Sequence, residues 1–163
     1  MPDPPDEPFL EGLRFLRAAI QTLPDGSAPR LLLVCPAGEA PSAEDVALYL
    51  AHSFAEAGKR VKFILPSPGP VMPARTGQWM DRVEIVPPGL PDTGTTPDPS
   101  EGEYVVEYSA VPAGQGTVAS GQRAILVFDP AAASLGDLKS AASSFRRAGT
   151  AVAGVALCKR RRA

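Results

Sequence analysis

The chain has little of what several common classes of protein need. Its 163 residues carry a formal net charge of −2, so it lacks the broad basic face that nucleic-acid binding requires. No apolar run approaches the roughly 20 residues of a membrane-spanning helix. The opening residues 1–8, MPDPPDEP, lack the basic and apolar segments of a signal peptide. We therefore expect a cytoplasmic protein that does not bind nucleic acid.

Cysteine and histidine are also scarce. Cys35 and Cys158 each end or follow a hydrophobic run, which favours small buried side chains in a reducing compartment over a disulfide framework or a metal site. We accordingly interpret Cys35 as a buried side chain rather than a reactive thiol. His52, the single histidine, lies inside a helical run without a visible Ser or Cys partner. We expect it to be half-exposed and structural, not catalytic.

Proline and glycine, in contrast, are abundant, with 19 and 15 residues. They imply long irregular segments, although 44% hydrophobic residues are typical of a soluble globular protein. The length fits one domain with a real core. We predict a disordered lead over residues 1–8, a single domain over 9–158 with a loop-rich part at 66–102, and a basic tail at 159–163.

Hydrophobic periodicity predicts the elements of that domain. An amphipathic helix is expected at about 8–23, a second helix at 43–57 that Gly58 ends, and a third from Ser134 to Gly149. Buried strands are expected at 30–35, 60–65, 82–86, 103–108, 123–128 and 151–158. Strands that alternate with helices favour an α/β fold with a mostly parallel central sheet that helices cover on both faces.

Three blocks of sequence resemble one protein family. They are Glu11-Gly-Leu-Arg-Phe-Leu-Arg17, which continues to Ile20-Gln21, the block from Leu50 to Val61, and the block from Ala124 to Val155. The first is similar to the E-x-x-R-x-x-R helix of bacterial tyrosine kinases (BY-kinases) of capsule and exopolysaccharide synthesis, which are MinD-like P-loop ATPases. The resemblance implies a P-loop NTPase-like fold. It covers most of the chain except residues 66–102.

The signature residues of that family are missing. In register with the following helix, Ala40-Pro-Ser-Ala-Glu-Asp45 stands where the family has G-E-G-K-[ST]-[ST], so Ala43 replaces the lysine and Glu44 the magnesium-binding hydroxyl. Ile64-Leu-Pro-Ser-Pro68 replaces an aspartate-rich motif, and Glu107-Tyr-Ser-Ala110 replaces D-T-P-P. The tyrosine-rich tail is also absent. The resemblance therefore implies a degenerate member without catalytic, cofactor-binding or metal-binding residues.

The physical chemistry of the loop after the first strand leads to the same expectation. A P-loop binds phosphates through glycine-rich backbone N–H groups, a lysine and a magnesium ion. Here Gly38 is the one glycine before the helix. Ala40 and Pro41 follow it, and proline has no N–H. We expect Ser42 to be an N-cap with Asp45 as its capping-box partner. Glu44 and Asp45 then place two carboxylates at the helix start, each worth about 0.3–1 kcal/mol, where they would repel a phosphate.

An atypical nucleotide or small-anion site remains the alternative for this loop. In that case Glu107 would hold a metal supplied in some other way.

The first helix carries Glu11, Arg14 and Arg17 within an arc of about 120°, apart from its apolar side. One interpretation is a solvated face with a weak ion pair of roughly 0.2–0.5 kcal/mol. The other follows from the family, in which this helix packs on the neighbouring subunit and builds a ring. It makes these three residues an oligomer interface, with Glu44 and Asp45 of the next protomer as acceptors for the guanidinium groups.

The sequence thus supports one leading function and two alternatives. The leading hypothesis is a catalytically inactive scaffold or regulatory subunit of capsule, exopolysaccharide or adhesin export. It would assemble with itself or with a kinase homologue, and dock on a membrane polysaccharide co-polymerase, peripheral to the inner membrane. The alternatives are an ATPase or kinase whose site another chain completes, and a MinD-like positioning factor without an ATP switch.

The basic tail has two interpretations. Lys159, Arg160, Arg161 and Arg162 would meet an anionic membrane surface at about 1 kcal/mol per charge, or form an ordinary disordered end.

Overall fold

The computed structural model describes residues 6–24, 26, 29–64, 83–86, 103–109 and 122–158. Residues 1–5 of the predicted lead, most of the loop-rich part at 66–102 and the tail at 159–163 lie outside these described residues. Three residues predicted to belong to the lead are instead part of the first helix: Asp6 is its N-cap, and Glu7 and Pro8 are its first two residues.

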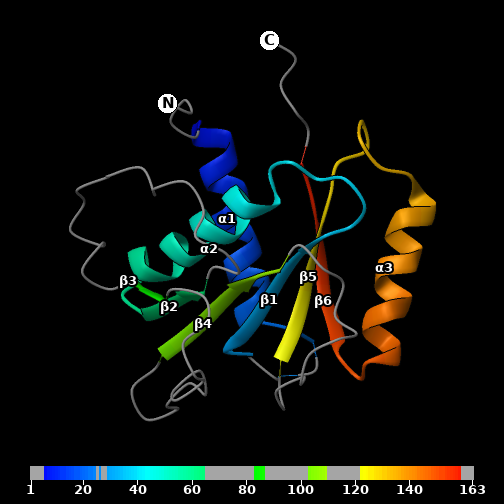
Figure 1. Cartoon of the computed structure of the whole chain (residues 1–163). Helices are drawn as coiled ribbons and strands as arrows, with labels where there is room; N and C mark the ends of the chain where they lie inside the picture. The colour runs from blue at the N-terminus through cyan, green and yellow to red at the C-terminus, as the bar shows by residue number, and fades with distance from the viewer. Residues whose placement is uncertain are drawn as a thin grey trace.

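A six-stranded sheet forms the centre of the molecule (Figure 1). Its order is β3-β2-β4-β1-β5-β6, and every pair of neighbours is parallel. The predicted parallel α/β fold is confirmed. The strands are β1 (Leu31–Pro36), β2 (Arg60–Ile64), β3 (Val83–Val86), β4 (Glu103–Tyr108), β5 (Gln122–Phe128) and β6 (Ala151–Leu157).

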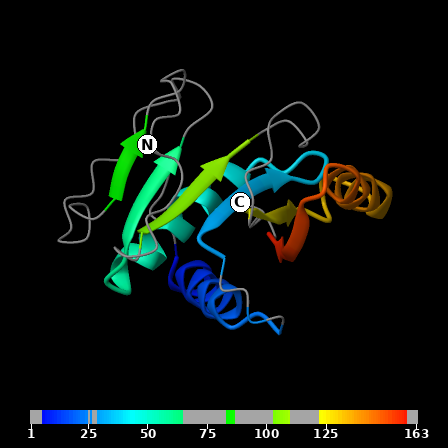
Figure 2. The same cartoon turned by 90° about the horizontal axis from the view of Figure 1, so that it is seen from below.

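Helices cover both faces of this sheet (Figure 2). α1 (Glu7–Gln21) and α2 (Ala43–Glu56) lie on one face, and α3 (Leu135–Arg147) lies on the other. Successive residues of a strand point to opposite faces. Leu32 and Val34 of β1 therefore join the core under α1 and α2, whereas Leu33 and Cys35 join the smaller core under α3.

The first helix packs mainly against α2. Leu13 and Ile20 are its buried residues, and the ring of Phe9 meets that of Tyr49 edge to face at 5.8 Å. The side chain of Asp6 caps the helix, because its Oδ1 accepts a hydrogen bond from the N–H of Phe9 at 3.0 Å. The predicted helix is confirmed, although it starts one residue earlier and ends two residues earlier than expected.

The two helices that follow a strand are capped differently. Ser42 is the N-cap of α2, but its side chain makes no capping hydrogen bond, so the capping box predicted with Asp45 is wrong. The capping box lies at α3 instead. Ser134 Oγ accepts from the N–H of Asp137 at 3.2 Å, and Asp137 Oδ2 accepts from the N–H of Ser134 at 2.8 Å.

Ser134→Ala should therefore destabilise the protein by about 0.5–2 kcal/mol, while Ser42→Ala, the same change at the other N-cap, should have little effect. The two bonds from Ser134 lower the pKa of Asp137 in the folded protein. A lowered carboxyl pKa stabilises the fold above about pH 4, and that contribution is lost as the pH falls through the lowered value. Urea unfolding at pH 7 and pH 3 should show the difference between Ser134→Ala and wild type shrinking in acid. Equal losses in both serine variants would contradict the assignment.

Candidate functional site

The topology identifies one crevice at which a ligand is expected. In open parallel sheets, ligands bind at the carboxyl ends of neighbouring strands whose connections leave in opposite directions. β1 and β5 are neighbours of this kind, because β1 continues through α2 to β2 on one side of the sheet and β5 continues through α3 to β6 on the other. The loop that the sequence predicts to be a degenerate P-loop follows β1 and lies at this point.

The loop crosses the carboxyl ends of the strands and contacts the start of α3. Figure 1 shows it arching from β1 toward α3 before it returns to α2. The N–H of Ala37 donates to the carbonyl of Val127 on β5 at 2.9 Å. Gly38 has a positive φ of 71°, and a Cβ added there would lie 2.9 Å from the Cβ of Asp137 and 3.0 Å from that of Ala133. The loop therefore contacts α3 so closely at Gly38 that only glycine fits.

Ala43, the residue predicted to stand at the lysine position of a P-loop, is part of the core in this chain. Ala43 is fully buried, and its N–H donates to the carbonyl of Ala40 at 3.0 Å. Ala37 and Ala40 are buried as well. Small apolar side chains thus anchor the loop from inside, and no cationic side chain occurs in residues 36–45.

Acidic and phenolic side chains lie beside this loop. Glu44 and Asp45 stand in the first turn of α2, and burial raises the pKa of Asp45. The pKa of Tyr108, at the end of β4, is raised by burial first and then by the charge of Glu44. Asp129, just after β5, is buried, and its Oδ1 accepts from the N–H of Ala131 at 2.9 Å. An incoming phosphate would meet a negative surface.

The two cysteines behave as structural side chains. Cys35 is 1% exposed, and burial, followed by the charge of Glu107, raises its pKa to about 12. The prediction of a buried Cys35 is confirmed, and its thiol is unreactive at neutral pH. Cys158 is only partly buried; burial raises its pKa, and a hydrogen bond with the side chain of Ser42 lowers it.

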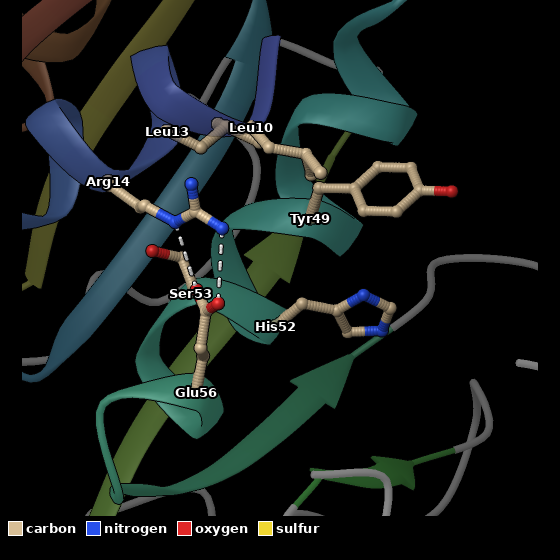
Figure 3. Close-up of a pocket in the computed structure, with 7 residues that line it drawn as sticks. All are labelled: Leu10, Leu13, Arg14, Tyr49, His52, Ser53 and Glu56. Carbon is tan, nitrogen blue, oxygen red and sulfur yellow. Dashed lines mark hydrogen bonds and ion pairs between the residues drawn. The ribbon is translucent and has the colours of Figure 1, made fainter. Parts of the chain in front are cut away.

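The predicted interface residues of α1 do not share one role. Arg14 donates two hydrogen bonds to Glu56 of α2, with Nε–Oε2 and Nη2–Oε1 distances of 3.2 and 3.1 Å (Figure 3). Its Nη1 also lies 2.8 Å from Oε1 of Glu7. These acidic partners raise the pKa of Arg14. Arg17 donates to the carbonyl oxygen of Ser53 and, at 3.0 Å, to its Oγ. Glu11 remains on the exposed side of the helix.

Arg14 and Arg17 therefore connect α1 to α2 through hydrogen bonds within one chain. No local pattern indicates these contacts, because Ser53 and Glu56 lie far along the chain from the arginines. Glu44 and Asp45, proposed as acceptors, stand at the opposite end of α2 from Ser53 and Glu56.

A small cavity opens where α1 meets α2 (Figure 3). Its volume is about 160 Å³, well below the roughly 300–1,000 Å³ of sites for drug-sized ligands. His52 lies in its wall, buried and edge to face with Tyr49 at 5.2 Å, so the expected half-exposed histidine is wrong. The lining residues are Leu10, Leu13, Arg14, Tyr49, His52, Ser53 and Glu56.

The described residues contain neither a metal-binding cluster nor a membrane-spanning helix. No group of three or more His, Cys, Asp or Glu residues among them is arranged to hold a metal ion. No helix in the same part of the chain is long and apolar enough to cross a bilayer.

Comparisons with known proteins identify the fold. No family model matches the chain, and no curated protein does. Among solved structures, the chimerical protein CapA2B2 matches with a TM-score of 0.63 and 17% identity, over 94% of this chain and 85% of that one. The VpsO kinase domain matches with a TM-score of 0.61 and 11% identity, over 94% of this chain and 97% of that one. The chain thus shares the fold of a kinase domain along nearly its whole length.

We predict that Arg17→Ala destabilises the protein by about 1–3 kcal/mol, because it removes charged hydrogen bonds to a part-buried serine. Arg14→Ala is the matched control. Its partners are exposed, with side-chain exposures of 72% for Glu7 and 50% for Glu56, so we expect little change in the free energy of unfolding. Urea unfolding of the two variants would measure the difference. A larger loss of unfolding free energy in Arg14→Ala than in Arg17→Ala would show that the exposed hydrogen bonds of Arg14, not those of Arg17, stabilise the packing of α1.

Proposed function

We propose that this protein is a catalytically inactive, tyrosine-kinase-like scaffold or regulatory subunit of a bacterial polysaccharide export system. The observation that carries the proposal is the loop after β1. In a fold that serves as a kinase domain elsewhere, the loop at the ligand crevice packs Gly38 against Asp137 and buries Ala43. This packing supports a loop that no longer binds phosphate.

The charges around the loop support the same conclusion. Phosphoryl transfer depends on positioned cations that offset the charge of the phosphates. Here the start of α2 carries Glu44 and Asp45, whose carboxylates already complement the helix dipole. Restoring one lysine would not rebuild the site, because Pro41 offers no N–H and Gly38 packs against Asp137 and Ala133.

The link to polysaccharide export rests on two similarities. The helix that contains Glu11, Arg14 and Arg17 resembles the E-x-x-R-x-x-R helix of the polysaccharide tyrosine kinases. The VpsO kinase domain shares the fold of the chain. This helix pattern favours the polysaccharide branch over a MinD-like positioning factor.

Assembly is proposed to use the outer side of α1. Because Arg14 and Arg17 are engaged with α2, the groups that α1 offers to another subunit are Glu11 and Phe15, whose ring is 71% exposed. The earlier pairing of the arginines with Glu44 and Asp45 of the next protomer would require Arg14 to leave Glu56. An arginine double variant would loosen α1 as well as any interface, so it cannot test assembly cleanly.

Titration calorimetry with magnesium-ATP tests the loss of the catalytic site. We expect no saturable binding, with a dissociation constant above about 1 mM, in wild type and in Glu44→Gln/Asp45→Asn. The neutral variant separates repulsion from the missing loop chemistry, and an active kinase of this fold serves as the positive control. Micromolar binding by the wild type would contradict the proposal and favour an atypical ATPase.

Co-purification with a polysaccharide co-polymerase tests the partner. We expect the wild-type chain to be retained by the cytoplasmic part of the co-polymerase, and Glu11→Arg/Phe15→Ser to lose at least about tenfold in affinity, or 1.4 kcal/mol. Leu135→Ser, which changes an exposed apolar side chain at the start of α3, is the control and should bind normally. Retention by cell-division or DNA-segregation proteins instead would support the positioning factor.

A further inference from the structure

The last strand, β6, forms one edge of the sheet. In the part of the chain that the structure describes, β5 pairs with its inner side and no strand pairs with its outer side. The core under α3 is built from residues of β1 and β5, so α3 packs on a face of the sheet. An open edge presents a row of backbone N–H and C=O groups that can pair with another strand.

Within the described residues, neither a charge nor a proline protects β6 against pairing. β6 reads AVAGVAL and contains no charged residue and no proline, whereas β3 at the opposite edge carries the exposed Glu84. Val155 is 43% exposed and Leu157 is 68% exposed. Exposed apolar side chains on an uncharged edge strand are the features that natural edge strands normally avoid.

Both exposed side chains lie on the same face of the sheet. Val155 pairs with Leu126 and Leu157 with Phe128, and those two β5 residues belong to the core under α3. Residues paired across parallel strands point to the same face. Val155 and Leu157 therefore extend the apolar surface of that core to the rim of the sheet.

The backbone of these residues points outward. The N–H of Cys158 donates to the carbonyl of Phe128 at 3.0 Å, so Cys158 directs its backbone groups toward β5. Because alternate residues of a strand direct these groups to opposite sides, Ala156 also faces β5, while Val155 and Leu157 face away from the sheet. The exposed side chains and the outward hydrogen-bonding groups thus belong to the same two residues.

We propose that β6 is an interface at which a second copy of this chain adds its own β6, antiparallel, across a two-fold axis at Ala156. In this register Val155 lies opposite the partner's Leu157, and Leu157 lies opposite the partner's Val155. Each pair exchanges two backbone hydrogen bonds, because both of its members face outward. The four exposed apolar side chains meet on one face and cover each other.

The strand fits a copy of itself better than the other edge of the sheet. A two-fold interface requires one patch to complement itself, and the two outward residues of β6 do so in a single register. A register shift opposite Ala124 and Ile125 leaves Ala153 as an extra residue, so regular pairing stops there. Pairing with β3 would set Glu84 into an apolar strand pair. This inference uses β6 and does not depend on the proposed role of α1.

Light scattering on the purified full chain tests the interface. At high micromolar concentration we expect the mass to approach twice the 17.0 kDa of one chain, and Leu157→Lys to lower it to that of one chain. Leu135→Lys is the matched control, because Leu135 is 67% exposed but lies at the start of α3, and it should stay dimeric. Leu157→Pro, which removes an outward N–H and spares the bonds to β5, should also be monomeric.

Disulfide trapping tests the register. Ala156 lies opposite the partner's Ala156 at about 4.5 Å between Cα atoms, within disulfide range. Ala156→Cys in a Cys158→Ser background should give a covalent dimer on oxidation, and Leu157→Cys should not, because its copies lie about 8 Å apart.

The proposed β6 interface would be overturned by a wild-type monomer at every concentration, by a dimer that survives Leu157→Lys, or by equal cross-linking of both cysteine variants. A dimer lost in Glu11→Arg/Phe15→Ser but kept in Leu157→Lys would also overturn it, and would support assembly through α1 instead. Failure of ATP or co-polymerase experiments would leave the β6 result unchanged, so the two proposals can be judged separately.

Discussion

A parallel sheet has to be covered on both of its faces, and most of this structure follows from that requirement. β1 supplies buried side chains to both cores, so helices must lie above and below it. α2 and α3 meet the requirement on opposite faces, and their connections leave the sheet in opposite directions. The crevice between β1 and β5 is a result of this arrangement. Any chain with this topology has such a crevice, and its loops decide whether the space holds a ligand.

In this chain the loop at the crevice is part of the packing of the domain. Gly38 allows the loop to touch the first turn of α3, and the buried alanines of the loop extend the core above the strand ends. The carboxylates of Glu44 and Asp45 lie in the first turn of α2, where they complement the helix dipole. The fold of a kinase domain thus accommodates a loop that packs against α3 and a helix start that carries two carboxylates.

The sequence predicted the regular elements well because their signals are local. Hydrophobic periodicity and the glycine after α2 located three helices and six strands to within a few residues. Long-range contacts were missed. Nothing near Arg14 indicates Glu56, and nothing near Gly38 indicates Asp137, because those partners meet only after folding. Ser42 and Ser134 share the same short pattern, and the capping box forms only at Ser134.

The strand order also constrains when the sheet can form during synthesis. β1 and β2 are successive along the chain, yet β4 lies between them in the sheet. The hydrophobic β1 therefore has no strand partner until Val105 and its neighbours have emerged from the ribosome. Until then, the contacts between α1 and α2 are the packing available to the amino-terminal third of the chain. A nascent chain would depend on that helix pair to shield β1 from aggregation.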